Sequence, residues 1–246
     1  MPVLAGIAGA GVLTALFAAL TWAIFANYVV TIDTAVSSAV QSLRSPPLTD
    51  LMTFATYLAS WQVVVGGTAA LVILLAVAGK RGPWIGTLML AVIGDEIIVW
   101  TGKQIFRRAR PDQNLSLMPT FDPSFPSGHT FITMAFYGIL AWFGIAALRR
   151  FWQKLAVGLA WALLALAVGF SRIYLGAHWP TDVLGSYLLG GAWLVGMATI
   201  FSTLQPASAA PRAPLTKSKR ALGFALLVLW VGVIAWMNVT HPGITG

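Results

Sequence analysis

Residues 154–175 read KLAVGLAWALLALAVGFSRIYL. No charged side chain lies between Lys154 and Arg172, and the run consists almost entirely of small, aliphatic and aromatic residues. A helix needs about 20 predominantly apolar residues to cross the hydrocarbon core of a bilayer. This stretch has that length, so it predicts a membrane-spanning helix.

The whole chain is similarly rich in apolar residues and poor in charged ones. Of its 246 residues, 58% are hydrophobic and only 9% are charged, and the mean hydropathy is +0.82. A soluble domain carries about 25% charged residues, because it must cover its surface with them. The composition therefore indicates an integral membrane protein. It excludes a disordered chain and a nucleic-acid-binding protein, and the absence of cysteine excludes a disulfide scaffold.

Seven apolar runs are long enough to be candidate spans. They lie at 3–30, 62–79, 83–106, 128–148, 154–175, 181–203 and 221–239. We expect the first to be retained, because it lacks the basic segment of a signal peptide and its apolar core is longer. The expected fold class is all-α, a polytopic membrane helix bundle with a six-span core and a seventh, C-terminal span.

Three parts are expected along the chain. Residues 1–204 form the membrane core, which includes short interfacial helices at about 32–60, where apolar residues recur at helical spacing between polar ones. Residues 205–220 are rich in Pro, Ala and Ser and end in a basic cluster, so they predict a cytoplasmic linker. Residues 221–246 are expected to form an accessory transmembrane helix and a tail.

The positive charges predict an orientation. If the spans alternate, nine of the 15 Lys and Arg residues fall on one side: Lys80, Arg81, Arg149, Arg150, Lys154, Arg212, Lys217, Lys219 and Arg220. Cytoplasmic loops carry an excess of Lys and Arg, so this side is expected to be cytoplasmic. The loops at 107–127 and 172–182 would then face outward from a cytoplasmic (inner) membrane.

Three polar motifs lie at the ends of spans on the predicted outer side. They are Lys103 followed by Arg110-Pro111, then Pro126-Ser127-Gly128-His129, and finally Ser171-Arg172 followed by His178 and Asp182. Ionisable groups at the edge of a membrane are costly and usually functional. Since the topology brings all three motifs to one side, we expect them to form one site.

These residue types suit a phosphoryl group. Lys103, Arg110 and Arg172 are permanent cations, and arginine can donate two parallel N–H bonds to phosphate oxygens. Ser127 and Gly128 precede a helix, whose first N–H groups can point at an anion. Such a site stabilises the charge that spreads over a phosphoryl group as its ester bond breaks.

The two histidines suit different steps. A histidine can attack phosphorus when another group fixes its tautomer, and Asp182 follows His178 by four residues. His129 would protonate the departing oxygen as a general acid.

With these motifs the chain resembles the phosphatidic acid phosphatase type 2 superfamily, which also includes vanadium haloperoxidases. All three family motifs are present, with the family's spacing, between residues 103 and 182. The resemblance implies His178 as nucleophile, Asp182 as its partner and His129 as general acid. It also implies that five other residues bind the phosphate: Lys103, Arg110, Ser127, Gly128 and Arg172. No metal and no cofactor are expected.

The same residues have other interpretations. Two histidines and a carboxylate can bind iron or zinc, but the clustered cations would repel a dication. Arg107, Arg108 and Arg110 could by themselves be a headgroup anchor. Asp95 and Glu96 lie in the middle of a predicted span, where carboxylates are costly. A structural role is slightly favoured for both, and they are not assigned to the catalytic residues.

The expected function is hydrolysis of a phosphate monoester or pyrophosphate on a lipid through a phosphohistidine. Candidate substrates are undecaprenyl pyrophosphate, phosphatidylglycerol phosphate and phosphatidic acid. The expected partners are this phosphorylated lipid and membrane lipids, with no nucleic acid; the sequence does not predict an oligomeric state. The alternatives are a lipid phosphotransferase with the same site and a non-catalytic phospholipid-binding or transport protein.

Overall fold

The computed structural model describes residues 3–79 and 82–204, and these residues form helices and loops without a strand. The helices before the long loop are α1 (Val3–Phe25), α2 (Val30–Gln41), α3 (Pro46–Tyr57), α4 (Trp61–Val77) and α5 (Pro83–Phe106). After the loop follow α6 (Gly128–Ile132), the π-helical turn η1 (Thr133–Tyr137), α7 (Gly138–Ala147), α8 (Phe151–Tyr174) and α9 (Pro180–Leu204). The predicted all-α membrane bundle is confirmed.

Five helical segments are long and apolar enough to cross a membrane: α1, α5, the continuous α6–η1–α7 segment, α8 and α9. The span predicted at 62–79 corresponds to α4, which has 17 residues and qualifies only together with α3, across a bend of 45°. The described residues therefore contain five spans, or six if the bent pair is counted as one. The linker predicted at 205–220 and the span predicted at 221–239 lie outside the described residues.

The long helices pack closely because small residues lie where their backbones meet. A side chain at Gly6 of α1 would collide with the Oγ1 atom of Thr199 of α9. Gly94 of α5 has the same relation to Trp193 of α9. Without a hydrophobic force between helices in lipid, such close contacts supply much of the packing energy.

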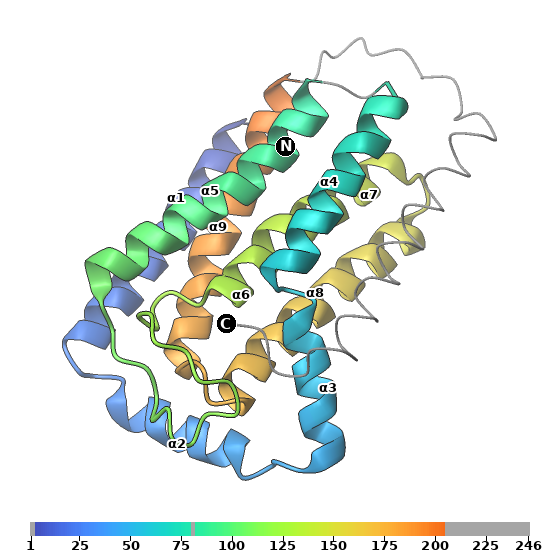
Figure 1. Cartoon of the computed structure of the whole chain (residues 1–246). Helices are drawn as coiled ribbons and strands as arrows, with labels where there is room; N and C mark the ends of the chain where they lie inside the picture. The colour runs from blue at the N-terminus through green and yellow to red at the C-terminus, as the bar shows by residue number, and fades with distance from the viewer. Residues whose placement is uncertain (1–2, 80–81, 205–246) are drawn as a thin grey trace.

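The interfacial helices predicted at about 32–60 correspond in sequence to α2 and α3; α2 lies across one end of the bundle beside the loop at 107–127, and α3 leads from that end to α4 (Figure 1). Helix α2 buries polar residues, Asp33 and Ser37, and exposes Ile32 and Val36. A soluble helix does the opposite, so this orientation fits a helix whose outer face contacts lipid. The end covered by α2 and α3 is where the three sequence motifs meet.

Candidate active site

The candidate site lies where α5 and α8 end and α6 and α9 begin (Figure 1). Lys103 is in the last turn of α5, Arg172 in the last turn of α8 and Asp182 in the first turn of α9. Ser127 and Gly128 begin α6, which carries His129, while Arg110 and His178 lie in loops. Charges of Arg110, Arg172, Lys103 and His129 all act on His178, so the predicted site residues form one cluster.

Local sequence places His178 and Asp182. Gly176 has a φ of +79°, a left-handed conformation that ends α8 and turns the chain so that the Ala177 N–H donates to the Arg172 carbonyl. Pro180 then begins α9, and the Asp182 carboxylate accepts the Trp179 N–H at 2.9 Å. This is half of a capping box, in which an acidic side chain three residues into a helix satisfies the backbone before it.

His178 is buried, and its two ring nitrogens face different partners. Nε2 lies 3.2 Å from an Arg110 nitrogen, while Nδ1 lies 3.5 Å from Asp182 Oδ2. Because an arginine can only donate, Nε2 is the accepting nitrogen, and the ring proton belongs on Nδ1 beside Asp182. Burial and the charges of Arg110, Arg172 and Lys103 hold the pKa of His178 well below its usual range, which keeps the ring neutral. The lone pair of Nε2 therefore faces the cations.

The cations lie close enough to His178 for their charges to act on it, with Arg110 at its accepting nitrogen. Arg172 is 1% exposed, donates to Thr56 Oγ1 at 2.7 Å, and has an Nε with no hydrogen-bond partner among the described residues. His129 Nε2 is likewise buried without such a partner in this part of the chain. Buried donors without partners are rare in proteins, and phosphate oxygens would satisfy them.

Asp122 was not predicted as a site residue, and it pairs with two of the predicted cations. Its carboxylate forms ion pairs with Lys103 and, at 2.7 Å, with Arg110. Burial raises the pKa of Asp122, but the hydrogen bond from Lys103 and the charges of Lys103 and Arg110 outweigh it and lower the pKa below its usual range. Asp122 is therefore an anion that partly neutralises the site. The side chain is 50% exposed, so it lies at the entrance.

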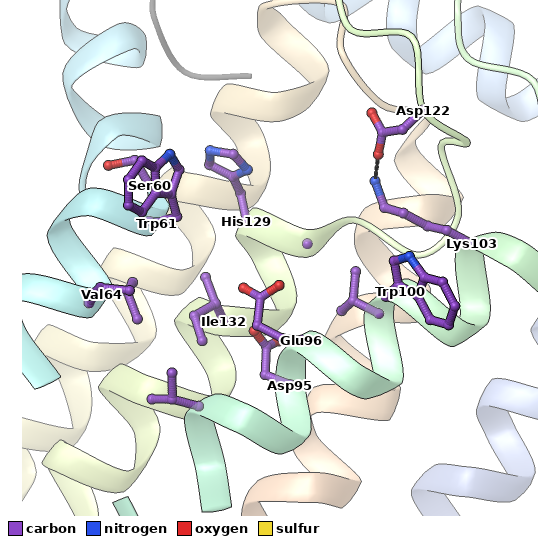
Figure 2. Close-up of a pocket in the computed structure, with 15 residues that line it drawn as sticks. Ser60, Trp61, Val64, Asp95, Glu96, Trp100, Lys103, Asp122, His129 and Ile132 are labelled. Atoms are coloured by element: carbon purple, nitrogen blue, oxygen red, sulfur yellow. Dashed lines mark hydrogen bonds and ion pairs between the residues drawn. The ribbon is translucent and has the colours of Figure 1, made fainter. Parts of the chain in front are cut away.

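A cavity of about 500 Å³ opens from the site between α4, α5 and α6. Figure 2 shows Lys103 and Asp122 on one side of His129 and Trp61 on the other, with Asp95 and Glu96 of α5 below it. Most other lining residues are apolar: Ala59, Val64, Val65, Val92, Val99, Trp100 and Ile132. Asp95 and Glu96 thus border the cavity instead of contacting the phosphate-binding residues.

Two further polar residues that were not predicted contact the site. Arg108, considered only as a possible headgroup anchor, donates to Asp182 Oδ1 at 2.5 Å, and Asp33 of α2 pairs with Arg108 at 2.6 Å. The sequence holds a weak signal for both, because it contains only seven acidic residues and each buried one needs a partner. Among the described residues, no group of three or more His, Cys, Asp or Glu side chains could hold a metal ion.

Comparison with known proteins identifies the family. The model of the PAP2 superfamily matches residues 84–206, half of the chain and all three motifs. The chain belongs to the PAP2 superfamily. The resemblance inferred from the motifs is confirmed, and with it the enzyme class, a membrane phosphatase.

Individual relatives agree with this membership. Phosphatidylglycerophosphatase B of Bacillus subtilis (strain 168) is 35% identical over 71% of this chain and 85% of its own length. Glucose-6-phosphatase 3 of Mus musculus is 32% identical over 57% of this chain but only 39% of its own length. A crystal structure of the transmembrane PAP2-type phosphatidylglycerolphosphate phosphatase from Bacillus subtilis has a TM-score of 0.72 at 29% identity, covering 80% of this chain and 98% of that one. The roles of individual side chains stay predictions.

The ion pairs of Asp122 predict a change in anion affinity. Asp122→Asn removes the carboxylate that competes with an incoming anion for Lys103 and Arg110. We expect vanadate, a phosphate analogue, to inhibit this variant about fivefold more tightly, because a half-exposed ion pair contributes up to about 1 kcal/mol. The measurement is the vanadate inhibition constant of the purified protein.

Asp112→Asn is the control, since Asp112 lies in the same loop but accepts hydrogen bonds only within it, from Asn114. This variant should keep the vanadate inhibition constant of the unmodified protein. Equal constants for all three proteins would contradict a competing role for Asp122.

Proposed function

We propose that this protein removes a terminal phosphoryl group from a membrane lipid through a phosphohistidine at His178. The main support for a lipid substrate is the apolar cavity that opens beside His129 and Lys103. A cavity lined by Val, Ile and Trp at the depth of a membrane suits a hydrocarbon chain, whose phosphate would then lie against the cations. A free sugar phosphate would leave that apolar surface unused.

In the first step of the proposed reaction, Nε2 of His178 forms a bond to phosphorus and the bond from phosphorus to the lipid oxygen breaks. His129 gives that oxygen a proton, so the lipid leaves as a neutral alcohol or as a monophosphate. The phosphoryl oxygens are stabilised by Lys103, Arg110 and Arg172 and by the first N–H groups of α6, at Ser127 and Gly128. Asp182 stabilises the positive charge that develops on the His178 ring.

In the second step, water attacks phosphorus, the P–N bond breaks and phosphate is released. His129, now neutral, accepts a proton from the attacking water and returns to its starting state. The balance of the two steps requires no metal or cofactor, since protein cations supply the positive charge that many phosphatases take from metal ions.

Among candidate substrates, phosphatidylglycerol phosphate is favoured over undecaprenyl pyrophosphate and phosphatidic acid. The support is that phosphatidylglycerophosphatase B of Bacillus subtilis (strain 168) is similar to this chain over 85% of its own length. A phosphotransferase with the same phosphohistidine would transfer the phosphoryl group to a second lipid, and product analysis separates it by the absence of free phosphate. A non-catalytic binding or transport protein would form no phosphohistidine.

The covalent step is tested with histidine variants assayed in EDTA. We expect His178→Ala to lower phosphate release by about a thousandfold or more, as loss of a nucleophile does. His129→Ala should accumulate phosphorylated enzyme with p-nitrophenyl phosphate, whose leaving group needs no proton. Phosphohistidine is measured as protein-bound phosphate that is labile to acid and stable to base.

The control for these variants is His241→Ala, because His241 is the third histidine of the chain and belongs to none of the three motifs. It should keep unmodified activity. Undiminished phosphate release by His178→Ala would refute the mechanism, and activity that returns only with an added divalent metal would refute its metal independence.

The cavity predicts that binding depends on the hydrocarbon chain of the substrate. Val92→Phe places a larger side chain in the cavity, so we expect the KM for long-chain phosphatidic acid to rise about tenfold, near the lower end of the 1–3 kcal/mol cost of overpacking. Hydrolysis of p-nitrophenyl phosphate should be unchanged. Ile93→Phe is the control, because Ile93 is the next residue of α5, is 50% exposed and does not line the cavity. Equal KM values for both variants would argue against lipid binding there.

We further propose that the site faces outward from the cytoplasmic membrane. The turn between α7 and α8 lies at the end of the bundle opposite the site (Figure 1). Arg149 and Arg150 belong to this turn and Lys154 follows in α8, and an excess of Lys and Arg is typical of cytoplasmic loops. The chain has no cysteine, so Asn114→Cys and Gln153→Cys introduce single thiols at opposite ends. An impermeant thiol reagent should label position 114 in spheroplasts and spare position 153. The reverse pattern would place the site on the cytoplasmic side.

A further inference from the structure

A buried polar cluster lies behind the His178–Asp182 pair. The Arg108 side chain donates to Asp182 Oδ1 at 2.5 Å, to Thr181 Oγ1 at 2.8 Å and to Asp33 Oδ2 at 2.6 Å. Asp33 also accepts the N–H and the hydroxyl of Thr181, at 3.0 and 2.7 Å. The cluster therefore joins three segments far apart in the sequence: α2, the loop after α5 and the start of α9.

The cluster holds charges where water scarcely reaches them. The side chains of Asp33 and Asp182 are 2% and 0% exposed, and that of Arg108 is 13% exposed. Burying a charge without a partner is strongly destabilising, so each of the three needs the others. One guanidinium reaches both carboxylates through separate nitrogens, a geometry that lysine, with its single ammonium, cannot reproduce.

Arg108 controls how Asp182 faces His178. A carboxylate has two oxygens, and Arg108 binds Oδ1 of Asp182. Oδ2 accepts the Trp179 N–H at 2.9 Å and lies 3.5 Å from His178 Nδ1. With both oxygens engaged, the carboxylate cannot rotate freely, and Oδ2 stays directed at the histidine.

Asp33 limits how far Arg108 neutralises the negative charge of Asp182. An arginine paired with Asp182 alone would offset the negative charge that stabilises a positive ring on His178. Because Arg108 also pairs with Asp33, the three residues together carry one net negative charge. Asp182 therefore keeps its electrostatic effect on His178 while Arg108 fixes its orientation.

We propose that Arg108 and Asp33 are positioning residues for phosphoryl transfer, which hold the Asp182 carboxylate toward His178 and keep it negatively charged. This inference rests on the proposed function, since it assigns Asp182 to the nucleophile His178. It gives α2 a role in catalysis, because Asp33 is on the buried face of a helix whose other face is apolar and exposed.

The test is Asp33→Asn, which removes the charge with almost no change of size and keeps one of the two oxygens, either the one that accepts from the Thr181 N–H or the one that accepts from Arg108. We expect kcat to fall about tenfold to a hundredfold, the range seen when the outer partners of a functional ligand are removed. The vanadate inhibition constant should stay within about threefold, because Lys103, Arg110 and Arg172 are unchanged; this also shows that the variant is folded. Asp50→Asn is the control, as Asp50 is an exposed residue of α3, and it should keep unmodified kcat.

Arg108→Lys is the second variant, since it keeps the charge but lacks the two separate nitrogens that bind Asp33 and Asp182. We expect a similar fall in kcat with unchanged vanadate inhibition, while Arg107→Lys, at the adjacent exposed arginine, should have no effect. If the two residues act through one another, Asp33→Asn combined with Arg108→Lys should cost no more than the larger single effect.

The outcomes separate this inference from the proposed function. Unmodified kcat in either Asp33→Asn or Arg108→Lys, or fully additive losses in the double variant, overturns the positioning role while leaving the phosphohistidine mechanism in place. A parallel loss of vanadate inhibition and kcat in both variants also overturns it, because it indicates a purely structural role. If the unmodified protein forms no phosphohistidine, the proposed function itself fails.

Discussion

The constraint on which the rest of this structure depends is the burial of positive charge at the end of a membrane bundle. Arg172 is almost completely enclosed, and Lys103 and Arg110 are 13% and 6% exposed. In such surroundings a cation without an anion is very costly. The neighbouring carboxylates offset this cost, with Asp122 at the entrance and Asp182 behind the histidine.

The segment from α2 to α3 satisfies the same constraint. Helix α3 supplies Thr56 as an acceptor for Arg172, and Arg44, between α2 and α3, donates to the carbonyls of Tyr174 and Leu115. The segment between α1 and α4 therefore both closes the end of the bundle and fixes the loops that carry Arg110 and His178. Affinity for a phosphoryl group and stability of the fold are coupled here, because both depend on where the cations are held.

Much of this arrangement could be predicted from the sequence, because membrane spans and spaced motifs are local patterns. The apolar runs predicted the spans closely, although the first helix ends at Phe25 and α4 qualifies only with α3. The order of the motifs predicted that Lys103, His129 and His178 would meet. Asp33, Arg108 and Asp122 were missed because their partners are set by folding: nothing in the spacing of Asp33 indicates a residue 75 positions away. The amphipathic pattern of α2 predicted an interfacial helix, but it did not predict that the buried polar face would reach the site.

The outward apolar face of α2 has a consequence for how the surrounding lipid acts on this enzyme. An exposed apolar face of this kind is typical of a helix that lies at the membrane interface, in contact with the headgroups and upper acyl chains of one leaflet. Bilayers of different thickness or lateral pressure hold such a helix at different heights relative to the spans. The lipid around α2 would then influence how Asp33 is placed behind the site, and turnover would depend on the composition of the surrounding membrane.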